Sequence, residues 1–297
     1  MTRLAYLGTP DMAVPPLRAL VDAGHDVALC VTRPDRRRGR GKEETASPVK
    51  AAATELGLPV THDMDDLVAP GVDVELAVVV AYGRIIPLRL LERVPMVNLH
   101  FSLLPRWRGA APVERAILAG DHQTGVCLMR VEEGLDTGPV YATRTVPLDD
   151  DISLDALRRE LVSVASTLVV DALAHGVAGL PAPRPQEGEV TLADKITKED
   201  LHLDWAAPAV ELRRRVRLGR AWTTFRGKRL TVLETTAGPG GAPDDTRPPG
   251  SLDGAVVATG RGSLVLRRVQ PESRSPMSAE EWLRGVRPEA GERLGTD

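Results

Sequence analysis

The chain has 297 residues, of which 42% are apolar and 27% are charged, a composition typical of a globular protein that buries a large core and divides into two domains. Acidic residues (41) outnumber Lys and Arg (38), so the net charge of -3 gives no sign of a nucleic-acid partner, and any such surface requires local segregation of charge. No apolar run is long enough to span a membrane, and the first residues do not have the pattern of a signal peptide. We therefore expect a cytoplasmic protein.

The first residues predict a strand, a turn and a helix. Residues 4–7 are apolar, residues 8–11 form the turn, and apolar side chains then recur at helical spacing. A second apolar run at residues 27–31 completes a strand–helix–strand order, which indicates a parallel βαβ unit. Gly8 belongs to no Gly-x-Gly-x-x-Gly motif, so a dinucleotide site is not supported, although an open sheet of this kind binds its ligand at the carboxyl ends of its strands.

Residues 33–42 form a glycine-interrupted basic loop that contains Arg38, Arg40 and Lys42 and has almost no apolar side chain to anchor it. Such a loop is either simply solvated or an arm that neutralises phosphates. Directly after it, Ser47 and Pro48 predict the start of a helix, with Ser47 as the N-cap and Pro48 at the first helical position.

Residues 74–80 are almost entirely apolar, as expected of a central parallel strand that is covered on both faces. The run ends at Ala81, Tyr82 and Gly83. Tyr82 is equally well explained as a half-buried aromatic at the end of a strand and as one wall of a ligand pocket.

The stretch from Met96 to Gly138 contains the polar residues best suited to chemistry. Asn98 and His100 are two residues apart in an apolar run that predicts a strand, so both side chains leave the same face. An amide and an imidazole on one face can hold a carbonyl oxygen while negative charge develops on it. Asp136 follows between two glycines and offers a carboxylate that would orient the imidazole or accept a proton. Taken alone, an Asn-x-His pair is more often structural.

The elements that follow complete the first domain. Residues 123–131 and 139–146 predict two strands, and residues 152–173 form an amphipathic helix whose apolar face should pack on the sheet. The segment that follows is rich in prolines and charged residues and has no periodic pattern of apolar residues, which indicates a linker. The expected boundaries are therefore a first domain over residues 1–183 and a linker over residues 184–203.

Residues 204–297 predict a second, smaller domain, because a short helix is followed by several short strands separated by turns, a pattern typical of a small β-barrel. Between residues 210 and 230 there are eight Lys or Arg residues and one acid, Glu211. Trp222 and Phe225 are interleaved with these charges, a combination suited to an RNA backbone with an exposed base. The alternative is a basic helix face beside two core aromatics.

Two cysteines, Cys30 and Cys127, both lie in apolar strand-like runs. No metal-binding spacing surrounds them, so we expect buried thiols in a reducing compartment and no metal site.

The central stretch resembles the signature of folate-dependent formyltransferases, and residues 106–112 (Arg-Trp-Arg-Gly-Ala-Ala-Pro) are most similar to the branch that formylates initiator methionyl-tRNA. The resemblance covers nearly the whole chain and is carried by these segments: Gly8 to Asp11, Pro34 to Lys50, Val78 to Gly83, Asn98 to Pro112, Gly134 to Gly138 and, more weakly, Pro276 to Ala279. It implies an α/β catalytic domain with a Rossmann-like open parallel sheet, followed by an OB-like β-barrel that contacts tRNA, in a protein that acts as a monomer.

The resemblance also implies roles for individual residues. Asn98, His100 and Asp136 would be catalytic, with a protonated His100 and Asn98 stabilising the oxyanion. The formyl donor 10-formyltetrahydrofolate, used without a metal, would lie along Ser102, Leu103, Leu104 and Pro105 and near Tyr82 and Gly83. The tRNA would contact Arg38, Arg40, Lys42, Arg106, Arg108, Arg213, Arg217, Arg226 and Lys228.

One departure from the family pattern is Phe101, where the family has a small residue; its ring either narrows the formyl site or fills core on the opposite face. Other functions share the same catalytic residues. A formyltransferase acting on an amino sugar nucleotide or another small amine would not need the two basic segments, and a formyltetrahydrofolate hydrolase would transfer the formyl group to water. A non-catalytic RNA- or folate-binding protein is a further alternative.

Overall fold

The computed structural model describes residues 1–37, 44–238 and 247–296, which form two compact units. The first unit comprises Met1–Val113, Gln123–Pro147 and Leu157–Asp194, and the second comprises the rest of the described chain. Arg38, Arg40 and Lys42, three of the predicted tRNA contacts, lie outside the described residues.

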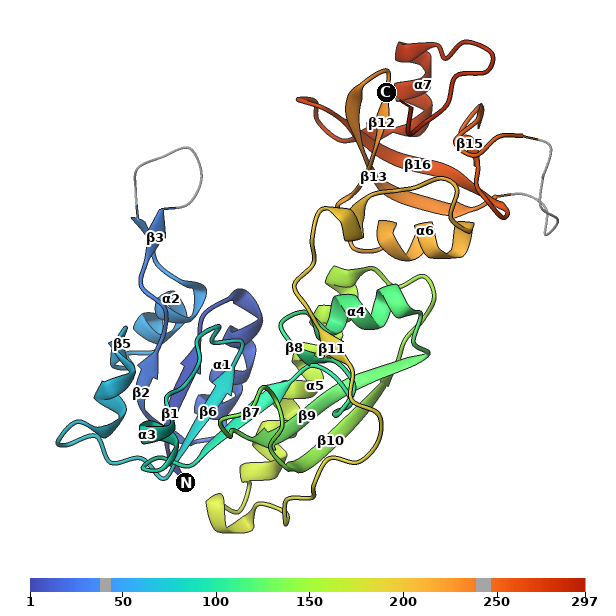
Figure 1. Ribbon diagram of the computed structural model, residues 1–297. Coiled ribbons are helices and arrows are strands. Elements are labelled where there is room, and N and C mark those ends of the chain that lie inside the picture. The colour runs from blue at the N-terminus through green and yellow to red at the C-terminus, as the bar shows by residue number, and fades with distance from the viewer. Residues whose placement is uncertain (38–43, 239–246, 297) are drawn as a thin grey trace. The chain divides into compact units, whose positions relative to one another are not determined.

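The first unit is built on a seven-stranded sheet with the order β10-β9-β7-β6-β1-β2-β5 (Figure 1). The five strands from β7 to β5 are mutually parallel, which confirms the Rossmann-like α/β prediction, whereas β9 and β10 are antiparallel additions at one edge. A short connection between β9 and β10 permits only an antiparallel pair. The strands are β1 (Arg3–Gly8), β2 (Asp26–Val31), β5 (Val60–Thr61), β6 (Leu76–Val80), β7 (Met96–His100), β9 (Gln123–Arg130) and β10 (Val140–Pro147).

The strand order reverses between β1 and β6, because the chain first builds outward from β1 through β2 to β5 and then continues on the other side with β6 and β7. Ligands of open α/β sheets bind at such a switch point, beyond the carboxyl ends of the strands. There the Thr9 hydroxyl, just after β1, donates a 3.1 Å hydrogen bond to the carbonyl of Tyr82, just after β6. His100 ends β7 at the same edge.

Helices connect most of these strands, and two features predicted for them are present in the structure. Ser47 caps the second helix by accepting a 3.1 Å hydrogen bond from the Lys50 amide, with Pro48 in the first turn, as predicted. The amphipathic prediction for residues 152–173 is confirmed by α5, whose leucines 154, 157, 161 and 168 are buried. The helices between residues 1 and 180 are α1 (Val14–Asp22), α2 (Pro48–Glu55), α3 (Leu88–Leu91), α4 (Pro112–Ala119) and α5 (Leu154–Leu173). Short 3-10 helices lie at Asp11–Ala13, Met64–Val68 and Val177–Gly179.

Cys30 and Cys127 are free and buried, which confirms the prediction of buried thiols. Burial raises the pKa of the Cys30 thiol to about 12, so that thiol stays protonated at neutral pH. Phe101 is also buried, among the core side chains of the chain.

The segment that was predicted to begin the linker is held against the first unit. We call residues 184–193 the strap. Arg184 exchanges two backbone hydrogen bonds with Val140, and β11 (Leu192–Ala193) pairs in parallel with β8 (Arg108–Gly109). Within the segment predicted as the basic loop, Arg36–Arg37 form β3, which pairs antiparallel with β4 (Glu44–Thr45).

The second unit is organised around a separate six-stranded antiparallel sheet, β12-β13-β16-β15-β14 with β17 beside β16. Leu212, Val232, Leu266 and Trp282 belong to its buried core. Phe225 lies in this core in an edge-to-face contact with Trp282, so the interpretation of Phe225 as a core aromatic is correct. The elements are α6 (Ala209–Val216), β12 (Ala221–Phe225), β13 (Lys228–Ala237), β14 (Leu252–Asp253), β15 (Val256–Ala258), β16 (Ser263–Pro271), β17 (Met277–Ser278), α7 (Ala279–Val286) and a 3-10 turn at Glu199–Leu201.

Arg217, predicted as a tRNA contact, is only 9% exposed and is used within the second unit. Its guanidinium donates hydrogen bonds of 2.8 Å to the Ile152 carbonyl and 2.7 Å to the Asp149 carbonyl. These bonds join the end of α6 to the segment before α5.

We therefore expect Arg217→Ala to lower the free energy of unfolding by about 1–3 kcal/mol, because two part-buried hydrogen bonds from a buried charged donor are lost. Urea titration measures this change, and Lys228→Ala, which removes an exposed cation from the same unit, should cost less than about 0.5 kcal/mol. Unchanged stability of Arg217→Ala together with weaker tRNA binding would instead support the surface role.

Across the described segments, no helix has the length and apolarity needed to cross a membrane. The same segments contain no cluster of three or more His, Cys, Asp or Glu side chains arranged to hold a metal ion.

Candidate active site

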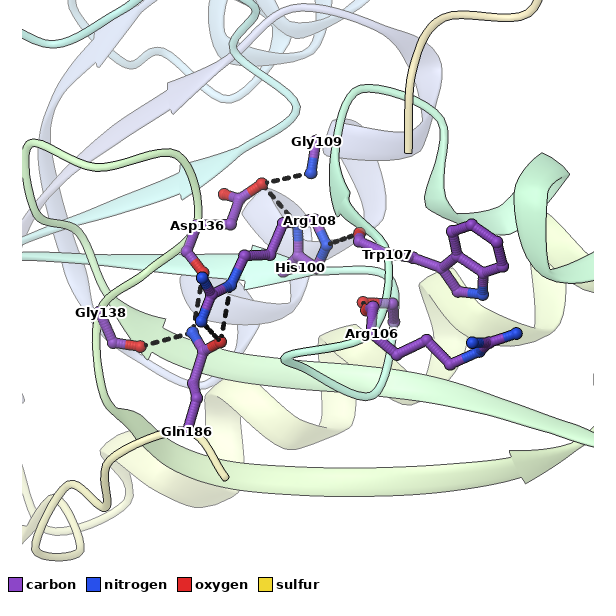
Figure 2. Close-up of polar contacts among 9 residues, drawn as sticks. His100, Arg106, Trp107, Arg108, Gly109, Asp136, Gly138 and Gln186 are labelled. Carbon is purple, nitrogen blue, oxygen red and sulfur yellow. Dashed lines mark hydrogen bonds and ion pairs between the residues drawn. The ribbon is translucent and has the colours of Figure 1, made fainter. Parts of the chain in front are cut away.

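His100 is the last residue of β7, and its side chain is buried with 5% of the residue exposed. Its Nε2 lies 2.8 Å from the carbonyl oxygen of Trp107, seven residues later (Figure 2). A carbonyl oxygen only accepts hydrogen bonds, so Nε2 carries a proton in this arrangement. Asn98 precedes His100 by two residues on the same strand, so the two side chains leave the same face, and Asn98 is half-buried.

Asp136 faces the other nitrogen of the ring. Its Oδ2 lies 3.5 Å from His100 Nδ1 and also accepts a 2.8 Å hydrogen bond from the Gly109 amide. The structure therefore brings together His100 and Asp136, which are 36 positions apart in the sequence numbering. A carboxylate facing Nδ1 helps to fix the orientation of the ring, and only a ring with protons on both nitrogens can donate to both neighbours.

Both residues that contact the imidazole have left-handed backbone conformations, with φ of 63° at Trp107 and 49° at Asp136. Such a conformation costs a residue other than glycine about 1–3 kcal/mol and persists only where its surroundings hold it. Gly109, whose amide binds Asp136, has φ of 124°, and a Cβ there would lie 3.0 Å from the Ala193 carbonyl oxygen. The partners of His100 are thus held by neighbouring segments.

Gln186 joins the two loops of the site and was not predicted. Its Oε1 accepts hydrogen bonds from Arg108 Nε (3.0 Å) and Nη2 (2.6 Å), and its Nε2 donates 2.8 Å bonds to the carbonyls of Asp136 and Gly138 (Figure 2). The bonds to Gln186 engage the guanidinium of Arg108, which was predicted to contact tRNA. Gln186 lies in a segment rich in prolines and charges, where no local pattern distinguishes it.

The residues predicted to bind the formyl donor have different environments. Ser102 is fully buried and donates a 2.6 Å hydrogen bond to the Arg106 carbonyl, and Pro105 is buried, whereas Leu103 and Leu104 are half-buried. Leu135, beside Asp136, is 63% exposed. Partly exposed apolar side chains next to a polar centre suit the face of a flat heteroaromatic ring such as a pterin, whose edge carries polar atoms.

Tyr82 and Gly83, also predicted to bind the formyl donor, differ in their exposure to solvent. The Tyr82 ring is only 2% exposed and belongs to the core cluster that contains Met64 and Ile86, so its side chain is a core residue in this structure. Gly83 is exposed and has φ of 77°, a conformation that favours glycine. Of the two, Gly83 is available at the surface.

Most of the predicted tRNA contacts that the structure describes have protein partners. Arg106 stacks over the Trp107 ring at 4.5 Å, and Arg213 is ion-paired with Asp151. Arg226 binds both carboxylate oxygens of Glu292, at 2.6 and 2.7 Å, and holds the pKa of that carboxyl down at about 2. Lys228 is exposed on β13, next to Arg229, which stacks on Trp222 at 4.9 Å.

Family models match both parts of the chain: "Formyl transferase" over residues 2–173 and "Formyl transferase, C-terminal domain" over residues 195–287. Among curated proteins, a methionyl-tRNA formyltransferase from Ruegeria pomeroyi is 42% identical over 308 aligned positions, covering 98% of this chain and 100% of that protein.

Solved structures share the fold at low sequence identity. A methionyl-tRNA formyltransferase from Clostridium thermocellum matches with a TM-score of 0.57 at 17% identity, covering 81% of this chain and 95% of that one. An N-formyltransferase from Helicobacter canadensis, in complex with folinic acid and dTDP-3-aminofucose, matches with a TM-score of 0.69 at 15% identity, covering 91% and 100% of the two chains. With both family models matched and a relative 42% identical over nearly its full length, the chain belongs to the formyl transferase family.

Proposed function

We propose that this protein transfers the formyl group of 10-formyltetrahydrofolate to the amino group of methionine on initiator methionyl-tRNA. The observation that carries the choice of acceptor is the 42% identity to a methionyl-tRNA formyltransferase over 98% of the chain, which includes the second domain. The role of residues 1–183 is then catalysis, residues 184–203 connect, and residues 204–297 contact tRNA. Such an enzyme acts as a monomer in the compartment where translation begins.

The reaction needs charge stabilisation and proton transfer. The lone pair of the methionyl nitrogen forms a bond to the formyl carbon, and the C=O π pair moves onto the oxygen. Collapse of this tetrahedral intermediate restores the C=O bond, breaks the bond to N10 of the folate, and moves the proton lost by the attacking nitrogen to N10. Asn98 and His100 stabilise the oxyanion, and Asp136 accepts and passes on the proton.

The contacts of His100 define how its ring takes part. Its Nε2 proton is donated to the Trp107 carbonyl at 2.8 Å, so an oxyanion stabilised by the ring would share this N–H with that carbonyl. Oδ2 of Asp136 is used by Gly109 and faces Nδ1 of the ring, which leaves proton transfer to Oδ1. We propose this division between the two carboxylate oxygens.

The basic loop is the first candidate for the additional affinity that a tRNA substrate requires. We expect Arg40→Ala combined with Lys42→Ala to weaken tRNA binding and to reduce the slope of log Kd against log salt by about 1–2, because fewer counterions are released. Filter binding between low and moderate salt measures the slope. Arg93→Ala combined with Arg159→Ala removes two exposed charges elsewhere and should leave it unchanged. An unaltered slope in the loop variant would remove the loop from the RNA surface.

A second candidate function is formylation of an amino sugar nucleotide, which the solved complex with folinic acid and dTDP-3-aminofucose suggests for the same fold. The two are separated by offering labelled donor to methionyl initiator tRNA, uncharged tRNA and a sugar-nucleotide amine in one mixture. We expect label on methionine alone. Label on the sugar amine would support the second candidate, and free labelled formate would indicate hydrolysis.

A further inference from the structure

Catalysis by His100 depends on the geometry of two backbone segments, because its ring contacts the Trp107 carbonyl on one side and the Asp136 carboxylate on the other. Neither segment is a regular element at these positions, and both residues have positive φ. The orientation of the ring is therefore only as well defined as the contacts that hold these two residues.

The strap supplies contacts to both. On the Trp107 side, Thr191 Oγ1 accepts a 2.9 Å hydrogen bond from the Trp107 amide, and the Thr191 carbonyl accepts one of 2.9 Å from the Arg108 amide. On the Asp136 side, Gln186 Nε2 donates to the carbonyls of Asp136 and Gly138 at 2.8 Å each. One segment thus reaches the loops that carry both partners of the imidazole.

We propose that Gln186 and Thr191 are positioning residues that fix His100 through Asp136 and Trp107. The proposal rests on the proposed function and adds to it two residues that do not touch the reacting atoms. Gln186 is suited to this position because it uses its oxygen toward Arg108 and its NH₂ group toward two carbonyls. A glutamate of the same length keeps the acceptor and loses both donors.

Three substitutions test the proposal. We expect Gln186→Leu and Gln186→Glu to lower kcat about 10–100-fold while the KM for methionyl-tRNA and for the donor changes less than about threefold, because the ring is misplaced and binding is retained. Thr191→Val keeps the shape and removes the acceptor for the Trp107 amide, and we expect it to lower kcat about fivefold. Gln123→Leu and Thr145→Val, at exposed positions of the same unit, serve as matched controls and should keep full activity.

A double-variant cycle separates positioning from a general loss of folded protein. In the Asp136→Asn background, Gln186→Leu should lower kcat less than about threefold further, because the group that it positions is already impaired. A multiplicative loss, a loss confined to KM, or wild-type kcat in all three variants would overturn the proposal. Should Gln186→Leu fail to fold, the same cycle with Gln186→Glu and with Thr191→Val tests the positioning role.

A readout independent of turnover keeps this inference distinct from the proposed function. The ¹⁵N chemical shifts of the His100 imidazole should change in Gln186→Leu and in Thr191→Val and remain at wild-type values in the controls. A wild-type protein that does not formylate methionyl-tRNA, with these shifts still altered in the variants, would contradict the function alone. Unaltered shifts with normal wild-type transfer would contradict the positioning role alone.

Discussion

Replacement of His100 by alanine should lower kcat for formyl transfer about 10³-fold or more, with the chain still folded. The imidazole is the group that can place a proton beside the developing oxyanion, and loss of one such donor costs about 10²–10³ in kcat, to which any loss of proton transfer adds. The ring is buried at the end of β7, yet its polar contacts are a hydrogen bond to a loop carbonyl and a 3.5 Å approach to a half-buried carboxylate, so the sheet itself is not disrupted.

Single-turnover transfer with saturating donor and methionyl-tRNA measures this effect without a contribution from product release. His175→Ala, at an exposed position of the same unit, is the matched control and should retain full activity. A His100→Ala protein with more than about a tenth of the wild-type rate would exclude His100 from the chemistry.

Asp136→Asn should lower kcat about 10²–10³-fold with little effect on folding. The asparagine oxygen can still accept the hydrogen bond of the Gly109 amide, so the loop keeps its main contact. What is lost is the negative charge facing His100 Nδ1 and, in the proposed mechanism, the oxygen that would receive the proton of the attacking amine. The change therefore isolates charge and proton transfer from shape.

Comparison with Asp22→Asn, an exposed aspartate of the same unit, controls for loss of one negative charge. Because Asp136 faces His100 Nδ1, we expect the two residues to act as a unit, so the double variant with His100→Ala should be no more than about threefold slower than the worse single variant. Independent, multiplicative losses would show that the two residues serve separate steps.

The strands and the pairing of His100 with Asp136 were predictable from short-range patterns and from the family signature. Alternation along a buried strand places Asn98 and His100 on one face, and an unbroken apolar run predicts the central position of β6. Asp136 was predicted because it lies between two glycines and within the family signature. These features depend on residues close in sequence or on a resemblance of the whole stretch.

Gln186 and Thr191 could not be predicted in the same way. Gln186 binds Asp136 across 50 residues, and Thr191 binds Trp107 across 84, inside a segment whose prolines and charges indicate only a connection. The sheet of the second domain was likewise only partly predicted: β12, β14 and β17 are short or lie next to basic turns, where alternation is not evident.

Charge density alone also could not separate surface cations from structural ones. Arg217 and Arg226 lie in the same basic stretch as Lys228, yet the first is buried against backbone carbonyls and the second is paired with Glu292. A local excess of basic residues shows only the composition of a segment. A tRNA-binding surface requires cationic side chains that are exposed and not bound to other groups of the protein.

The proposed formyl transfer is tested by whether N-formylmethionine forms on initiator tRNA. Methionyl initiator tRNA and 10-formyltetrahydrofolate are incubated with the wild-type protein or with His100→Ala, and the amino acid released from the tRNA is identified by mass. We expect N-formylmethionine in proportion to the donor consumed by the wild type, and essentially none with His100→Ala. Consumption of the donor without N-formylmethionine, or equal yields from both proteins, would contradict it.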